Sequence, residues 1–128
     1  MATDNRVFIS FAIEDANLRT LLVGQARNEA SPFSFVDMSV KEPWDSSWKT
    51  KCRTKIKGCD GVIGIITDNT PTGSGQIWEL ACAVEENVPV FLIYGNEDRP
   101  SSLPASIKGK RVHLSTWPNI EKFLDTLG

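Results

Sequence analysis

The clearest buried strand in the sequence is the stretch Gly61-Val62-Ile63-Gly64-Ile65-Ile66-Thr67. Its apolar residues follow one another without polar alternation, which is typical of a strand covered on both faces in a parallel sheet. A turn-rich loop, residues 68–75, and a stretch with helical periodicity, residues 76–86, come next. Because a strand that leads into a helix is the first half of a βαβ crossover, this segment predicts an α/β fold.

Similar strand-and-helix units lie on both sides of this stretch. Further strands are expected at residues 6–12, 33–37, 89–94 and 111–114, and further helices from about residue 14, over about 48–57 and near the end of the chain. Such alternation favours right-handed crossovers and a parallel sheet with helices on both faces. We therefore expect one flavodoxin-like, doubly wound, five-stranded domain over residues 1–128.

The spacing of apolar residues assigns a core-facing stripe to each helix. The expected core residues are Leu18, Leu21 and Leu22 in the first helix, Trp48, Cys52, Ile56 and Cys59 in and after the second, and Ile77, Leu80, Ala81 and Val84 in the third. In this phase Glu79 lies two positions from Ile77 and points away from the core. Gly58 is expected to end the second helix in the left-handed conformation that glycine accepts.

The bulk composition is that of an ordinary globular domain. The chain is 41% hydrophobic and 23% charged with a formal net charge of −2, so no global field favours nucleic acid or an anionic membrane. No apolar run approaches the roughly 20 residues that a spanning helix needs, and the N-terminus lacks the layout of a signal peptide. The three cysteines show no CxxC spacing. We therefore expect neither disulfides nor a metal site, and a cytoplasmic location.

Candidate site residues follow from the fold, because ligands bind beyond the carboxyl ends of the strands in an open parallel sheet. The residues expected there include Ser10, Phe11, Asp37, the loop 68–75 and Glu79, the last in the first turn of a helix. A carboxylate beside a sugar can stabilise the oxocarbenium-like state that forms when an N-glycosidic bond breaks. The alternative is that Glu79 is a helix-start acid stabilised by the helix dipole.

Other residues near these strand ends are open to two interpretations. The loop with Gly73 and Ser74 precedes a helix whose N–H groups could hold a phosphate, or it is a plain connection with Ser74 as the N-cap. Trp44 is an exposed aromatic that stacks on a base, or an anchor of its loop against the core. Trp78 lies on a helix and is interpreted first as a packing residue.

Several motifs, taken in their order along the chain, resemble TIR and TIR-like domains. Arg6-Val7-Phe8-Ile9-Ser10-Phe11 followed by Glu14-Asp15 resembles their opening strand and first helix, and residues 44–56 resemble the loop and helix after their second strand. The segment 58–67, then Thr70, then Trp78-Glu79-Leu80-Ala81, is similar to the TIR-like proteins of the bacterial Thoeris antiphage system. The resemblance spans about residues 6–95.

This resemblance implies a flavodoxin-like fold and an enzyme that cleaves NAD⁺, as a substrate and without a further cofactor, at the nicotinamide–ribose bond. The product would be an ADP-ribose-derived signal, cyclic in some members, that activates a separate effector protein. By position, Glu79 matches the catalytic glutamate, while Ser10, Phe11 and Ala12 match the strand-one lip of the pocket. Asp37 and Trp44 match a loop that contacts nucleotide across a protomer boundary, so self-association is expected. Gly73, Ser74 and Trp78 are the remaining expected substrate contacts.

One position departs from the family pattern. Many TIR enzymes place a tryptophan four residues before the catalytic glutamate, where this chain has Gly75, and Trp78 stands directly before Glu79 instead. The family also contains non-catalytic adaptors, since fold alone does not settle activity. A non-catalytic interaction domain is therefore the second hypothesis. A 2-deoxyribosyltransferase-like enzyme, which pairs a carboxylate with N-glycosidic chemistry on a similar fold, is the third.

Overall fold

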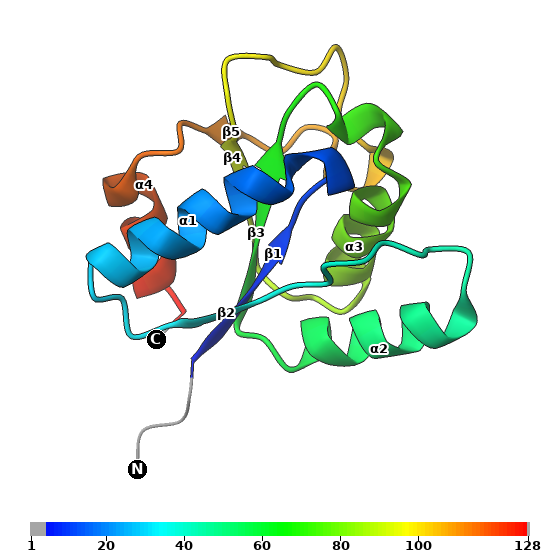
Figure 1. Ribbon diagram of the computed structural model, residues 1–128, viewed down its shortest axis with the longest axis horizontal. Coiled ribbons are helices and arrows are strands. Elements are labelled where there is room, and N and C mark those ends of the chain that lie inside the picture. Colours follow the sequence, from blue (N-terminus) through cyan, green and yellow to red (C-terminus); the bar gives the residue numbers. More distant parts are fainter. Residues whose placement is uncertain (1–4, 128) are drawn as a thin grey trace.

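Five parallel strands form the central sheet of the protein, in the order β2-β1-β3-β4-β5 (Figure 1). A computed structural model describes residues 5–127. The strands are β1 (Arg6–Ser10), β2 (Ser34–Val36), β3 (Gly61–Ile66), β4 (Val90–Tyr94) and β5 (Val112–His113). All five expected strands are present, each one or two residues shorter than the sequence predicted. The order is the flavodoxin-like one, and it reverses direction between β1 and β3.

Helices cover both faces of this sheet, as the alternating sequence predicted (Figure 1). They are α1 (Ala16–Asn28), α2 (Ser46–Lys57), α3 (Ser74–Glu85) and α4 (Trp117–Asp125). Short 3₁₀ turns, Ile13–Asp15 and Thr70–Thr72, precede α1 and α3, and a third, Ala105–Ile107, lies between β4 and β5. Within residues 5–127, no helix has the length and apolar character that crossing a bilayer requires.

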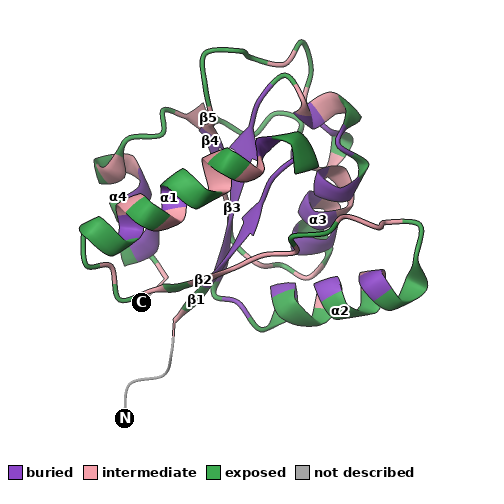
Figure 2. Ribbon diagram, viewed as in Figure 1, coloured by how far each residue is buried: buried purple, intermediate pink, exposed green. Residues whose placement is uncertain are grey.

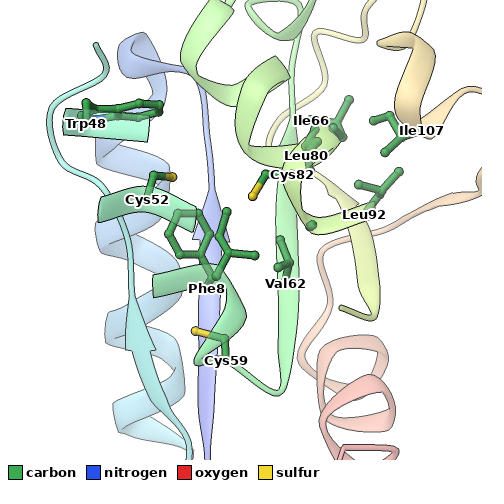
Figure 3. Packing of buried hydrophobic residues seen from close by; sticks show 12 residues of the cluster. Phe8, Trp48, Cys52, Cys59, Val62, Ile66, Leu80, Cys82, Leu92 and Ile107 are labelled. Atoms are coloured by element: carbon green, nitrogen blue, oxygen red, sulfur yellow. The ribbon is translucent and has the colours of Figure 1, made fainter. Parts of the chain in front are cut away.

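The core consists of two apolar clusters, one on each face of the sheet. The cluster beneath α2 and α3 includes Phe8, Trp48, Cys52, Ile56, Val62, Leu80 and Leu92, and the cluster beneath α1 and α4 includes Val7, Ile9, Leu22, Ile63, Ile65, Ile93, Ile120 and Leu124. Figure 3 shows how Phe8 and Val62 of the sheet face Cys52 of α2 and Cys82 of α3 in the first cluster. The buried central strands between the two helical layers stand out in Figure 2. Their continuous burial explains their unbroken apolar sequences.

The buried face of α3 differs from the one that the apolar spacing predicted. Its buried residues are Gly75, Gln76, Glu79, Leu80, Cys82 and Ala83. Ile77 and Ala81 are only partly buried and Val84 is exposed, so the expected outward direction of Glu79 is wrong. The first half of α3 lies over the ends of the strands, where Gln76 and Glu79 find hydrogen-bond partners. The apolar spacing predicted the wrong buried face because it assigns only apolar residues to the core, whereas this face also contains Gln76 and Glu79.

Two smaller expectations also fail. Leu21 is 66% exposed, because α1 packs on the sheet through Leu22 and Ala26. Gly58 does end α2, but with a φ of −82°, so it is right-handed and its conformation does not require glycine. The helix end is satisfied instead by a hydrogen bond from the Gly58 N–H to the carbonyl oxygen of Thr54.

Two glycines provide a matched test of the packing around α1. Gly95 follows β4, and a Cβ there would lie 2.6 Å from Ile65 Cγ2 and 2.7 Å from Leu18 Cδ1. Gly24 lies inside α1 with nothing within 4 Å of an added Cβ. We expect Gly95→Ala to lower the free energy of unfolding by about 1–3 kcal/mol through overpacking. We expect Gly24→Ala to raise it by about 0.5–1 kcal/mol through helix propensity.

Urea denaturation followed by circular dichroism measures both effects. Equal shifts of the same sign for the two variants would contradict the close approach of Gly95 to Leu18 and Ile65.

Candidate functional site

A fully buried carboxylate lies where the strand order reverses, between the ends of β1 and β3. Glu79 is 0% exposed, and α3, which carries it, follows β3. Because α3 begins at Ser74, Glu79 lies in its second turn and not in the first. Its Oε1 accepts a hydrogen bond from Ser10 Oγ at 2.9 Å, and its Oε2 accepts one from Lys41 Nζ at 2.7 Å. Both carboxylate oxygens therefore have a protein partner.

Gln76, one turn earlier on the same face of α3, holds this helix against the two central strands. Its side chain is fully buried, and Nε2 donates to the carbonyl oxygens of Ser10 at 3.2 Å and Ile65 at 2.7 Å. These carbonyls belong to β1 and β3, so one amide bridges the strands where their ends separate. Within residues 5–127, Gln76 Oε1 has no hydrogen-bond partner. Sequence reasoning missed Gln76, although its spacing of three residues from Glu79 indicates a shared face.

Lys41 reaches Glu79 from the loop that connects β2 to α2, residues 37–45. Its side chain is 5% exposed, and its ammonium group lies 3.9 Å from the centroid of the Phe11 ring. Its stem lies over Gly75, where an added Cβ would be only 2.6 Å from Lys41 Cβ. The absence of a side chain at Gly75 is therefore what leaves room for the lysine. Sequence reasoning missed Lys41, but it is the only basic residue in that loop.

The loop around Lys41 is fixed to α2 by two hydrogen bonds. Trp48 Nε1 donates to the carbonyl oxygen of Val40 at 2.6 Å, and Lys55 Nζ donates to the carbonyl oxygen of Asp37 at 3.1 Å. A hollow of about 280 Å³ lies on the α2 side of the loop, and Glu79 does not line it. A ligand can therefore touch Glu79 only if the loop moves and Lys41 leaves.

Burial dominates the electrostatics of Glu79. Loss of solvation raises the pKa of its carboxyl group from 4.5 to about 7, although the Lys41 charge and the hydrogen bonds from Lys41 and Ser10 lower it. The negative charge of Asp37 raises it slightly further. A carboxyl group with a pKa near neutrality can exchange a proton at physiological pH, and in its ionised form it can stabilise a nearby positive charge.

A second ion pair flanks the Phe11 ring. Arg19 Nη1 lies 2.8 Å from Asp37 Oδ2, and the Arg19 guanidinium carbon is 5.3 Å from the centroid of the ring. Two cations, each paired with a carboxylate, thus lie near one buried aromatic side chain. Asp37 is therefore close to the site, as the sequence predicted, but it pairs with Arg19 in this state.

Of the remaining expected site residues, some are buried beside Ser10 and others are exposed. Phe11 and Ala12 are buried beside Ser10, and Gly73 comes so close that an added Cβ would lie 3.0 Å from Ala12 Cβ. Ser74 is exposed and its side chain does not cap α3, whose N-cap residue is Gly73. Trp44 is 74% exposed, so it does not anchor its loop in the core.

Trp78 faces α2 and not Glu79. Its ring lies 5.5 Å from that of Trp48 in an edge-to-face arrangement, with the Arg53 guanidinium 5.4 Å from its centroid. It is therefore a packing residue of the α2–α3 interface, which was the first interpretation of its sequence position.

The loop before α3 is held by Asp15. This buried side chain accepts hydrogen bonds from Thr67 Oγ1 at 2.5 Å and from Asn69 Nδ2 at 3.0 Å. The contact joins the start of α1 to the residues that follow β3, and so anchors the loop that leads to α3. Over the part of the chain that the structure describes, no group of three or more His, Cys, Asp or Glu side chains could hold a metal ion.

The raised pKa of Glu79 predicts a dependence of stability on pH. Since the folded pKa of about 7 exceeds the ordinary 4.5, the folded state binds more protons between these values, and its contribution to the free energy of unfolding falls as pH rises. Relative to Glu79→Gln, which cannot ionise, we expect the wild type to lose up to about 3 kcal/mol between about pH 5 and pH 8.

Urea denaturation at a series of pH values measures this difference. Glu85→Gln is the matched control, because the Glu85 side chain on the same helix is 63% exposed and its ion pair with Arg53 lies at the surface, so its loss should change the free energy of unfolding by only about 0–1 kcal/mol. If the free energy of unfolding of the wild type, relative to that of Glu79→Gln, stayed constant or rose with pH, the burial of an ionisable carboxyl group would be contradicted.

In comparisons with known proteins, no family model and no curated protein matches this chain. The structure places a buried carboxyl group at the switch point of a flavodoxin-like sheet, and burial raises its pKa to about 7. Ser10 and Lys41 donate hydrogen bonds to its two oxygens, and Lys41 covers it.

Proposed function

We propose that the protein is a TIR-like enzyme that cleaves NAD⁺ at the bond between nicotinamide and ribose, with Glu79 as the catalytic carboxylate. The observation that carries the proposal is the placement of Glu79: a fully buried carboxylate between the ends of β1 and β3, where the strand order reverses and open α/β sheets bind ligands. A carboxylate without solvent contact costs free energy that an ordinary surface acid does not. Such a cost is typical of a functional residue.

The chemistry that Glu79 would perform is electrostatic. When the bond between the ribose carbon and the pyridinium nitrogen breaks, its electron pair leaves with neutral nicotinamide and the ribose becomes an oxocarbenium-like cation. An ionised Glu79 beside that carbon would stabilise the cation, and Ser10 would keep the carboxylate oriented through Oε1. Attack by water then gives ADP-ribose and a proton, whereas attack by an adenine nitrogen gives a cyclic product. Either would serve as a nucleotide signal in bacterial antiphage defence.

The closed loop predicts a slow resting enzyme. Lys41 and the loop around it separate Glu79 from solvent, so substrate has to displace them. Trp44 and Val40, both on this loop, are 74% and 58% exposed. Contact with a second copy or a partner through these side chains would supply a reason for the loop to open. Specific activity that rises with protein concentration is the expected sign of such control.

The proposed function is tested by incubating the purified protein with NAD⁺ and separating the products by chromatography. We expect Glu79→Gln to lower turnover by about 10²–10³-fold, which is typical for removal of one electrostatic stabiliser. Glu85→Gln is again the control on the same helix, and circular dichroism checks that both variants fold. Equal turnover by wild type and Glu79→Gln would remove Glu79 from the mechanism. Deoxynucleosides, assayed in parallel, test the deoxyribosyltransferase-like alternative through release of free base.

A non-catalytic interaction domain is the second candidate, and two observations favour it. Glu79 is completely enclosed, and glycine stands at position 75, where an aromatic wall is expected in the enzymes. In this alternative the Lys41–Glu79 pair only shapes the loop that presents Trp44. Absence of turnover over a wide range of protein concentrations, together with self-association that Trp44→Ser abolishes, would favour this function over the enzymatic one.

A further inference from the structure

The Lys41 ammonium group occupies a position with the properties of a binding site for an organic cation. It lies 2.7 Å from a carboxylate oxygen of Glu79 and 3.9 Å from the centroid of the Phe11 ring. A carboxylate and the face of an aromatic ring are both groups with which proteins hold cations away from water. Phe11 and Glu79 are both 0% exposed, so both attractions act where water screens little.

The walls of this position are held independently of the lysine. Ser10 Oγ holds the other oxygen of Glu79, and Gln76 fixes the same face of α3 to the ends of β1 and β3. Phe11 follows β1 and packs in the core cluster beneath α1. The lysine, in contrast, comes from a loop between β2 and α2. The carboxylate and the ring therefore belong to the sheet and its helix, while the cation between them belongs to the connection.

Gly75 is what makes room for the stem of this cation. An added Cβ would lie 2.6 Å from Cβ, 3.0 Å from Cγ and 3.1 Å from Cδ of Lys41, so three successive atoms of the stem run along the glycine. Withdrawal of Lys41 would leave a space bounded by Gly75, the Phe11 ring and the Glu79 carboxylate. A flat ring fits between a glycine backbone and an aromatic face more readily than a branched group does.

We infer that Phe11 and Glu79 form a binding site for a planar organic cation, and that Lys41 is the internal occupant with which such a ligand competes. The charge balance favours exchange over simple opening, because removal of Lys41 alone would leave the Glu79 carboxylate buried and unpaired. The other cation near the ring, Arg19, is paired with Asp37 and does not neutralise Glu79. Identification of the ligand with the pyridinium ring of NAD⁺ rests on the proposed function; the cation site itself does not.

The site is tested with two rings of the same shape and different charge, 1-methylnicotinamide (a cation) and nicotinamide (neutral), by isothermal titration calorimetry at pH 8. Lys41→Ala removes the occupant, and Lys41→Met removes its charge but keeps its stem. We expect Lys41→Ala to bind the cation at least tenfold more tightly than the wild type does, and at least tenfold more tightly than it binds nicotinamide. Lys41→Met, which leaves the space filled, should bind as weakly as the wild type.

A second route to the open site guards against misfolding of Lys41→Ala. Lys41→Ser also removes the stem and the charge of the occupant, and serine is well tolerated in an irregular loop. This variant should also gain affinity for the cation. In the Lys41→Ala background, Phe11→Leu and Glu79→Gln should each lower cation binding about tenfold while leaving nicotinamide binding unchanged.

The outcomes separate this inference from the proposed function. Charge-selective binding by Lys41→Ala and Lys41→Ser, without turnover of NAD⁺, would uphold the cation site and refute the enzyme. Turnover of NAD⁺ that depends on Glu79, with no preference of either variant for the charged ring, would overturn the cation site and leave the enzyme. Equal binding of the two rings, or binding of neither, also overturns the inference.

Discussion

A carboxylate that is removed from water needs a partner for each of its oxygens, and the arrangement around Glu79 follows from this constraint. One oxygen is satisfied by Ser10 at the end of β1, and the other by the ammonium group of Lys41. The first contact fixes α3 against the sheet. The second holds the connection between β2 and α2 over the strand ends, so the ion pair covers the carboxylate and adds to the hydrogen bonds that fix the loop to α2.

The position of the Lys41 side chain depends on glycine at position 75, because the stem of the lysine lies directly over Gly75. The family pattern that the sequence resembles has an aromatic residue at position 75, and any side chain there would collide with the stem of the lysine. Where the family pattern has an aromatic side chain, the glycine therefore leaves room for the side chain of Lys41. Phe11, from the opposite side, supplies the only ring in contact with that cation among the described residues. Glycine in place of the aromatic residue at position 75 thus allows Lys41 to lie between α3 and the Phe11 ring.

The sequence predicted the sheet better than it predicted the site, because the two depend on different kinds of signal. Unbroken apolar runs identify buried parallel strands from local information, and all five were placed within two residues of each end. Burial of Glu79 and Gln76 depends on a shared partner that no periodicity reveals, Ser10, which lies 69 and 66 residues away from them. Lys41 was missed for the same reason, because its partner Glu79 lies 38 residues away along the chain.

The two outer strands of the sheet have a consequence for how copies of this chain could meet. β2 has three residues and β5 has two, so each rim offers very few free backbone groups for pairing with another strand. Short rims of this kind discourage edge-to-edge stacking into fibrils, even in a protein whose central strands are as apolar as β3. Any ordered assembly would have to be built through side chains on helices and loops, where single substitutions can tune or abolish it.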